Sequence, residues 1–156
     1  MGRRIYIKGR KTYAKGETFE LEKKDRYYIN ISLLSLKTLK DYDLGRGGEF
    51  YFKVRRKRKT RRVPDRGEIF LMENQVFTAR QDFSLWTEFL ELEQGDEKNI
   101  ELDIELFERD TVKMDKKIFD EKVKLDLGSQ SKYIILEDEA KQTKAKLKIS
   151  TPRTRF

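Results

Sequence analysis

The stretch EFYFKVRRKRKTRRVPDR, residues 49–66, begins as a β-strand and ends as a dense run of cations. Aromatic residues such as Phe50 and Phe52 alternate along its first half, which is the period of a strand that buries one face. A return strand around residues 59–63, closed by Pro-Asp-Arg-Gly at residues 64–67, predicts a hairpin. The rest of the chain is interpreted from this antiparallel pair outward.

The excess charge of the protein is concentrated in the same stretch. From Lys53 to Arg66 there are nine Lys or Arg and one acid, Asp65, a local balance of +8. The chain has 36 basic and 28 acidic residues, so the remainder holds 27 of each and is neutral. Clustered cations of this density favour a polyanionic partner. The predicted polyanion-binding residues are Lys53, Arg55, Arg56, Lys57, Arg58, Lys59, Arg61 and Arg62.

Composition narrows the class of protein. With 156 residues the chain has the length of about one domain, and 12% aromatic residues argue against global disorder. Cys and His are both absent, which excludes disulfides, thiol catalysis and the usual zinc ligands. We therefore expect a non-catalytic protein without a cofactor. Abundant Glu and Lys without Cys is also typical of thermostable proteins.

Short strands recur along the whole chain, separated by turns rich in Gly and Asp. We expect a hairpin within residues 5–22, part of an N-terminal extension over residues 1–25, and a flexible tail at 151–156. Between these, a domain over residues 26–150 has predicted strands at 25–39, 49–56, 59–63, 68–72, 75–79, 87–92, 99–108, 119–128, 132–137 and 144–150. Eight or more short strands predict an antiparallel β-sandwich or barrel.

One segment permits a second interpretation. Between residues 68 and 92, the apolar positions Phe83, Trp86, Phe89 and Leu90 also fit the stripe of an amphipathic helix. We favour strands there because the neighbouring segments are all strand-like, and we expect Trp86 to lie in the core.

The clearest alternation is in NIELDIELFE, residues 99–108. The apolar residues of this segment alternate with Glu101, Asp103 and Glu105, so one face is expected in the core and the acidic face in solvent. That acidic stripe could meet the basic segment of a neighbouring copy, as in a virion or cell-surface assembly. Self-association is therefore one alternative for the function.

Four segments follow one another in an order that a known module shares. ISLLSLKTLKDYD at residues 31–43 is similar to its opening strand, and DLGRGGEFYFKV at 43–54 to its Asp, five-residue gap, Asp-Pro-Tyr-Val-Lys pattern. Lys59-Thr60, followed by LWTEFLEL at 85–92, is similar to its Lys-Thr pair and Pro-x-Trp-Asn-Glu segment. IELFERDTVKMDKKIFDEKVKL at 104–125 is similar to the strand and loop that carry Asp-x-Asp. Over residues 26–150 the chain thus resembles the C2 domain, a β-sandwich that docks proteins onto phospholipid.

The resemblance implies calcium ligands in loops at one end of the sandwich, where several hard oxygen ligands must converge. The matching positions are Asp43, Glu49, Glu108, Asp110 and Asp115. The chain departs from the pattern at Lys116, which stands where a ligating acid is usual, and at Phe119, which replaces a glycine. We therefore expect that calcium is not required.

The preferred function is that of an adaptor that binds anionic phospholipid membranes through the basic hairpin. Each cation near an anionic bilayer contributes on the order of 1 kcal/mol. A nucleic acid is the alternative partner, since its phosphates attract the same cations. No apolar run approaches the roughly 18 residues of a membrane span, and the start of the chain lacks the apolar core of a signal peptide. We expect a cytoplasmic, peripherally membrane-bound protein.

Overall fold

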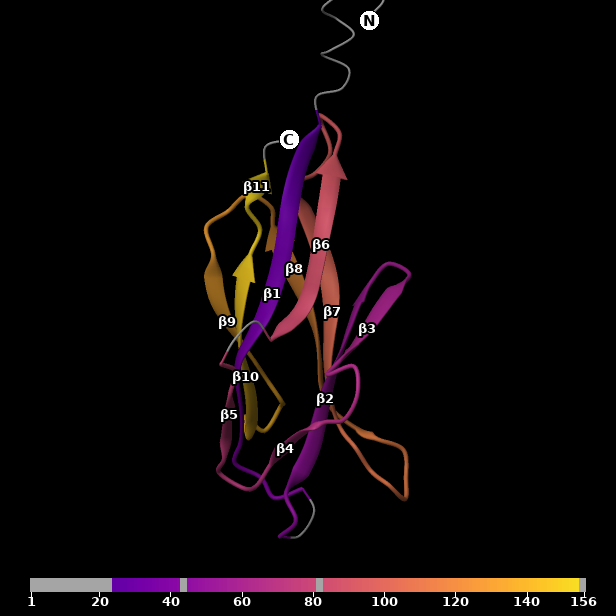
Figure 1. The fold of residues 1–156 in the computed structure, drawn as a ribbon, viewed down its shortest axis with the longest axis vertical. Helices are drawn as coiled ribbons and strands as arrows, with labels where there is room; N and C mark the ends of the chain where they lie inside the picture. Colours follow the sequence, from indigo (N-terminus) through magenta and orange to yellow (C-terminus); the bar gives the residue numbers. More distant parts are fainter. Residues whose placement is uncertain (1–23, 43–44, 81–82, 155–156) are drawn as a thin grey trace, which may run out of the picture.

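The computed structural model describes residues 24–42, 45–80 and 83–154, and all regular structure within them is β-strand (Figure 1). The hairpin expected within residues 5–22 lies outside the described residues. The strands are β1 (Asp25–Thr38), β2 (Gly48–Arg56), β3 (Lys59–Val63), β4 (Ile69–Leu71), β5 (Val76–Thr78), β6 (Ser84–Leu92), β7 (Asn99–Glu108), β8 (Lys116–Asp126), β9 (Lys132–Glu137), β10 (Thr143–Ser150) and β11 (Arg153–Thr154).

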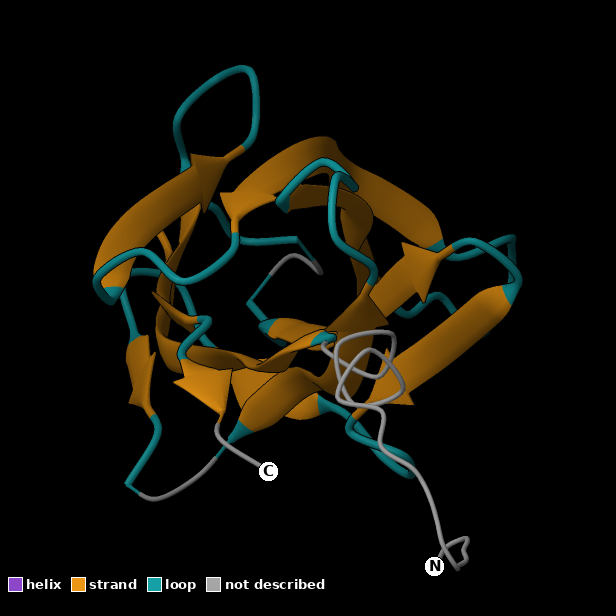
Figure 2. Cartoon of the chain, turned by 90° about the horizontal axis from the view of Figure 1, so that it is seen from above, coloured by secondary structure: helices purple, strands orange, loops and turns teal. Residues whose placement is uncertain are grey.

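The strands form two antiparallel sheets. In the first sheet β9, β10 and β1 lie side by side, and β5, β6 and the short β11 also pair with β1. The second sheet has the order β3–β2–β7–β8, and β4 also pairs with β2. Seen along the long axis, the two sheets curl around a shared interior (Figure 2). The predicted antiparallel β-sandwich is confirmed.

The core lies between the sheets and consists of the alternate residues that point inward from each strand. Because side chains of a strand alternate between its faces, every second residue reaches the core. The largest fully buried side chains are Phe50, Phe52, Ile29, Ile31, Leu33, Leu36, Leu85, Leu102, Ile104, Leu106, Leu125 and Leu147. Trp86 is 5% exposed and packs with this cluster, which confirms its predicted place in the core.

The ambiguous segment at residues 68–92 contains strands. β4, β5 and β6 occupy it, and β6 pairs with β1 over most of its length. Trp86 points into the core whereas Phe89 is 74% exposed, which is the two-sided alternation of a strand. The helical stripe would have placed both aromatic residues on one face, so the choice of strands is confirmed.

The basic stretch folds into a β2–β3 hairpin with a two-residue turn. Arg56 is paired with Lys59, and Lys57 and Arg58 form the turn between them. Lys57 adopts a φ of 55°, a left-handed conformation that favours glycine or asparagine. The turn therefore keeps a cation at a position where the backbone would prefer another residue.

The C-terminal residues described by the structure lie on the first sheet. Arg153 pairs with Tyr27, and Thr151 is 2% exposed and donates a hydrogen bond to the carbonyl of Asp126. Of the tail expected to be flexible from residue 151, residues 151–154 are therefore packed on the sheet. Residues 155–156 lie outside the described part of the chain.

Candidate functional site

A groove runs between the β2–β3 hairpin and strand β6 of the opposite sheet. Its volume is about 460 Å³, and an adjoining hollow of about 360 Å³ reaches Arg56 and Lys57 at the hairpin tip. We call the two together the basic groove. Its wall on the second sheet is cationic, and its wall on the first sheet is part of β6. The lining residues are Arg56, Lys57, Arg58, Lys59, Thr60, Arg61, Trp86, Thr87 and Glu88.

Arg56 and Glu88 form an ion pair that joins the two sheets at the base of this groove. Arg56 Nε donates to Glu88 Oε1 at 2.7 Å, and its Nη2 donates to Oε2 at 2.5 Å. Trp86 Nε1 also donates to Glu88 Oε1, at 3.0 Å. The two charged side chains are only 9% and 15% exposed. A two-pronged pair of this kind fixes the geometry as well as the charge of both groups.

These contacts keep Glu88 ionised. The hydrogen bonds from Arg56 lower the pKa of Glu88, against the opposing effect of burial, and the Trp86 donor acts in the same direction. The same pairing raises the pKa of Arg56. Glu88 is the one acid among the residues that line the groove, and Arg56 neutralises it. The groove therefore takes its charge from the remaining cations.

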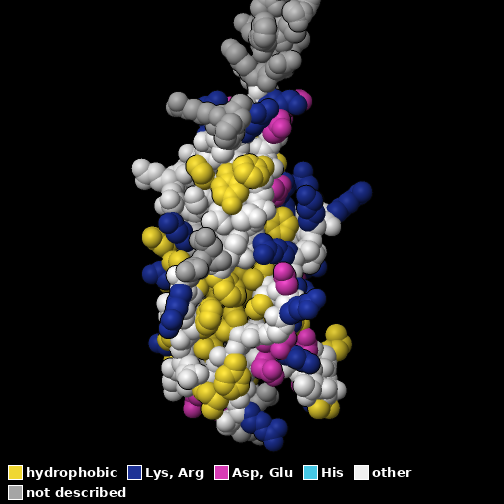
Figure 3. Space-filling view, in the orientation of Figure 1, with side chains coloured by type: hydrophobic (Ala, Val, Ile, Leu, Met, Phe, Trp, Pro, Cys, Tyr) yellow, Lys and Arg dark blue, Asp and Glu magenta, His cyan; other side chains and the backbone are white. Residues whose placement is uncertain are grey.

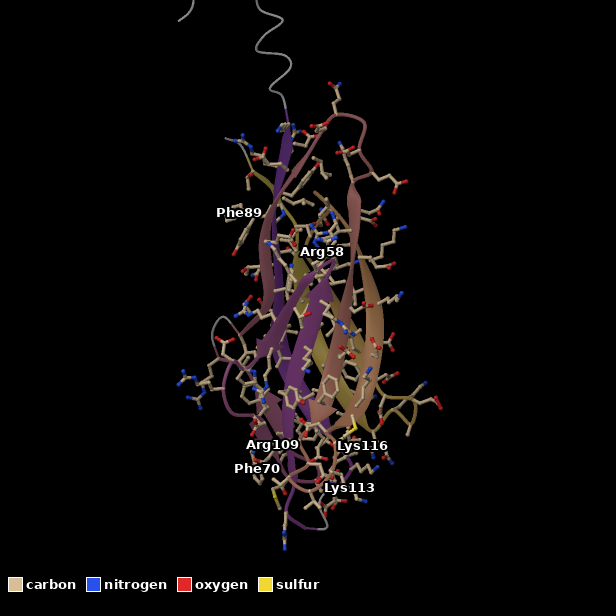
Figure 4. The ribbon with its side chains drawn as sticks, turned by 90° about the vertical axis from the view of Figure 1, so that its right-hand side faces the viewer. Arg58, Phe70, Phe89, Arg109, Lys113 and Lys116 are labelled. Carbon is tan, nitrogen blue, oxygen red and sulfur yellow. The ribbon has the colours of Figure 1, made fainter. Side chains whose placement is uncertain are left out.

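Those cations form no ion pair of their own. In the part of the chain that the structure describes, no ion pair involves Lys57, Arg58, Lys59 or Arg61, whereas each of the eleven ion pairs uses other cations. Arg58 projects outward at mid-height of the molecule in Figure 4. The structure thus gathers five of the eight predicted polyanion-binding residues in the groove: Arg56, Lys57, Arg58, Lys59 and Arg61.

The other three predicted residues lie on the outer face of the second sheet. Arg55 forms an ion pair with Glu105 at 2.8 Å, and Lys53 stands 5.3 Å from the centre of the Phe107 ring. Arg62 stacks over the Tyr51 ring at 4.1 Å, and its Nη2 lies 2.8 Å from Glu68. These cations are engaged within the fold.

The acidic stripe of β7 is matched within the chain in the same way. Glu105 was expected in solvent, but it is 3% exposed because Arg55 and Lys117 cover it with ion pairs of 2.8 and 2.7 Å. Asp103 lies opposite Arg55 on β2 and Lys122 on β8. The prediction for Glu105 is therefore wrong, and the stripe is not an unmatched acidic surface for a neighbouring copy.

The loop between β7 and β8 contains two of the predicted calcium ligands, and both accept internal hydrogen bonds. Asp110 Oδ1 accepts from the backbone N–H groups of Val112 and Lys113, at 2.9 and 3.0 Å. Asp115 accepts from the Asp110 N–H at 3.0 Å and from the Tyr51 hydroxyl. These donors lower the pKa of both aspartates. Burial, reinforced by Asp115, raises the pKa of Tyr51 to about 12.

The remaining predicted ligands are not assembled into a cluster. Glu108 is 5% exposed at the end of β7, and Glu49 lies at the start of β2. Asp43 is outside the described residues. Among residues 24–42, 45–80 and 83–154, no group of three or more acids is close enough to hold a metal ion. Lys116, at the start of β8, has a pKa lowered by the nearby ammonium of Lys40.

The tip of the same loop exposes apolar side chains among cations. Val112 is 88% exposed and Met114 is 91% exposed. Lys113, Lys116 and Arg109 surround the loop, below Arg58 on the side of the molecule that faces the viewer in Figure 4. Sequence reasoning did not select this loop tip. Its signal was the pair of isolated apolar residues in an otherwise charged loop.

The walls that β6 contributes were also missed as part of a site. Trp86 and Glu88 point inward from β6 near the edge of the sandwich, and only the pairing of distant strands brings them against the hairpin. The described residues include no helix that could cross a membrane.

Solved structures share this fold at low sequence identity. The first C2 domain of plant extended synaptotagmin 1 superposes with a TM-score of 0.51 and 12% identity, over 85% of this chain and 97% of that one. Human GIVD cytosolic phospholipase A2 gives a TM-score of 0.53 and 10% identity over 84% of this chain. The chain spans only 18% of the length of that phospholipase.

No protein-family model matches the sequence, and no curated protein is similar to it. The structural likeness nevertheless confirms the resemblance drawn from the sequence, because the synaptotagmin domain is matched over nearly its whole length. The chain has a divergent C2-like β-sandwich fold.

Proposed function

We propose that this chain is a non-catalytic module that binds anionic phospholipid membranes through the basic groove, without calcium. One observation carries the proposal: Lys57, Arg58, Lys59 and Arg61 line a groove in which Arg56 already neutralises Glu88, the one acid. Four unpaired cations on one surface are worth on the order of 4 kcal/mol near an anionic leaflet. The C2-like fold, which the domain of extended synaptotagmin 1 shares, is compatible with this role.

Independence from calcium is supported by the state of the loop acids. Asp110 and Asp115 spend their oxygens on internal hydrogen bonds, and Lys116 brings an ammonium group to the same end of the molecule. Ligation of a metal would have to break those hydrogen bonds and would face an added positive charge.

The first test is co-sedimentation of the wild-type chain with vesicles. We expect binding to phosphatidylcholine vesicles that contain phosphatidylserine and none to vesicles of phosphatidylcholine alone. Binding should fall steeply at about 1 M salt, where the Debye length shortens to about 3 Å. A chelator should leave it unchanged. Loss of binding in chelator would show that the loop acids hold calcium, and absence of binding to both vesicles would disprove the membrane proposal.

The exposed loop tip favours a membrane over a nucleic acid. Val112 and Met114 lie on the same side of the molecule as the groove, flanked by labelled cations in Figure 4. Apolar side chains gain nothing from a phosphate backbone in water, but they gain roughly 1.5–3 kcal/mol each when fully buried in an apolar phase. A bilayer offers anionic headgroups and an apolar interior together.

Replacing Val112 and Met114 by serine should therefore weaken vesicle binding while leaving the fold intact. Because both side chains are almost fully exposed, their loss removes little packing. We expect the partition coefficient for anionic vesicles to fall by about tenfold, since even partial burial of two apolar side chains is worth about 1.4 kcal/mol. Binding that is unchanged in this variant, but displaced by single-stranded nucleic acid, would favour the nucleic-acid alternative.

A further inference from the structure

A second set of cations lies on the outer face of the first sheet. Lys144, Lys146 and Lys148 are exposed at alternate positions of β10, and Lys37 on the adjacent β1 is exposed beside them. We call these four residues the lysine face. Alternate residues of a strand are spaced by about 7 Å, so the three lysines of β10 form a straight row. The intervening residues, Ala145 and Leu147, point into the core.

The lysine face is poorly neutralised within the chain. Lys37 lies directly opposite Lys144, an arrangement of like charges that destabilises a sheet. Among the described residues, one ion pair reaches the face, a 3.7 Å contact between Lys144 and Glu137 whose side chains are 48% and 32% exposed. Such an exposed pair is worth little. An external anion would relieve the repulsion that the fold leaves in place.

Exposed apolar side chains flank this row. On the edge strand β9, Tyr133 is 61% exposed and Ile135 is 60% exposed, opposite Lys148 and Lys146. The hollow near Lys37 and Lys144 holds only about 50 Å³, too little for the side chains of a peptide. A flat surface of lysines with an aromatic ring at its rim fits the interface of a bilayer, where amphipathic rings and cations are both favoured.

The lysine face and the basic groove lie on opposite sides of the molecule. In Figure 1, β9 and β10 form the left side and the β2–β3 hairpin projects to the right. Figure 3 shows Lys and Arg along both borders, with mainly neutral and apolar side chains between them. Small polar residues such as Asn30, Ser32 and Thr87 face outward in that central region. A flat bilayer that covers one side therefore leaves the other side free.

We propose that one molecule holds two anionic bilayers at once, with the basic groove on one and the lysine face on the other. The inference rests on the proposed function, because it assumes that the groove binds such a bilayer. It adds a second binding surface and a consequence that binding alone lacks, the clustering of vesicles. A single continuous surface would instead use both sets of cations on the same vesicle.

The experiment compares three variants of equal charge change. The lysine-face variant is Lys144→Gln/Lys146→Gln/Lys148→Gln, and the groove variant is Arg58→Gln/Lys59→Gln/Arg61→Gln. The control variant, Lys98→Gln/Lys122→Gln/Lys124→Gln, removes exposed lysines that lie near acids: Lys98 pairs with Asp25 at 3.8 Å, and the other two lie opposite Asp103 and Glu101. Vesicles of phosphatidylcholine with phosphatidylserine carry donor or acceptor dyes, so that clustering gives energy transfer.

The three variants separate the outcomes. We expect the wild-type chain and the control variant to cluster vesicles, and the lysine-face variant to lose at least about tenfold in clustering because three cations worth about 1 kcal/mol each are gone. Its affinity for immobilised single bilayers should change by less than about threefold, which is well under the effect of one such cation. Sedimentation velocity should show monomers before vesicles are added.

Three results would overturn the inference. They are clustering that survives in the lysine-face variant, a fall in its single-bilayer affinity as large as that of the groove variant, and a dimer in solution that accounts for clustering. Wild-type binding without clustering would reject the second surface while leaving the proposed function standing. Absence of binding to single bilayers would reject the proposed function itself.

Discussion

Neutralising Arg58, Lys59 and Arg61 in the groove variant should lower the partition coefficient for anionic vesicles by about a hundredfold. Each cation near the leaflet is worth about 1 kcal/mol, and 1.4 kcal/mol is a factor of ten in affinity. None of the three side chains forms an ion pair within the described part of the protein. Their removal should therefore cost binding without exposing a buried acid or unfolding the hairpin.

The control variant distinguishes a local surface from net charge. It also removes three positive charges, but from positions beside acids on β7 and at Asp25. We expect its affinity to stay within about threefold of the wild type, since exposed charges farther than a Debye length from the leaflet are screened. An equal loss in both variants would mean that overall charge, and not the groove, attracts the chain to vesicles. Thermal unfolding of each variant checks that the fold is retained.

Glu88→Gln should destabilise the protein by about 3–5 kcal/mol, the usual cost of removing one partner from a buried ion pair. Arg56 would then be left largely buried, facing an uncharged amide, with 9% of its side chain exposed. Urea-induced unfolding followed by Trp86 fluorescence measures the loss. Glu91→Gln, on the same strand, is the matched control. Its contacts with Lys24 and Arg26 are 3.8 Å long and half-exposed, so we expect a change below about 1 kcal/mol.

Acid should remove the difference between Glu88→Gln and the wild type. Arg56 lowers the pKa of Glu88 below its ordinary value of 4.5. A carboxylate whose pKa is lowered by folding adds stability above its unfolded pKa, and that stability is lost as the pH falls through the folded pKa. The gap in unfolding free energy should therefore be constant at neutral pH and shrink below about pH 4.5. A gap that persists in acid would show that packing, and not charge, is responsible.

The strands and the sheet class could be predicted from the sequence because alternation is a local signal. β7 illustrates this: Ile100, Leu102 and Ile104 are buried at alternate positions, as the pattern of NIELDIELFE predicts. Even the ambiguous segment with Trp86 resolved into strands. Burial of alternate residues needs only the local sequence and the presence of a second sheet.

The composition of the basic groove could not be predicted, because it depends on a turn and on distant strands. Sequence parity grouped Lys53 and Arg55 with Lys59 and Arg61. The two-residue turn changes the parity, so Arg62 joins Lys53 on the outer face while Lys59 and Arg61 line the groove. Which cations remain unpaired depends further on Glu88 and Glu105, whose positions follow from the pairing of β6 with β1 and of β7 with β2.

The pairing of β1 with β10 has a consequence for the synthesis of the protein. Asn30 lies opposite Ser150, so the central strand of the first sheet meets its neighbour only after almost the entire described chain has left the ribosome. Until then β1 can pair with β5 and β6 alone, and its other edge stays open. An open edge on an incomplete chain can pair with another nascent chain. Long-range pairing of this kind also slows folding. The row of charged lysines on β10 lies beside the edge that forms last.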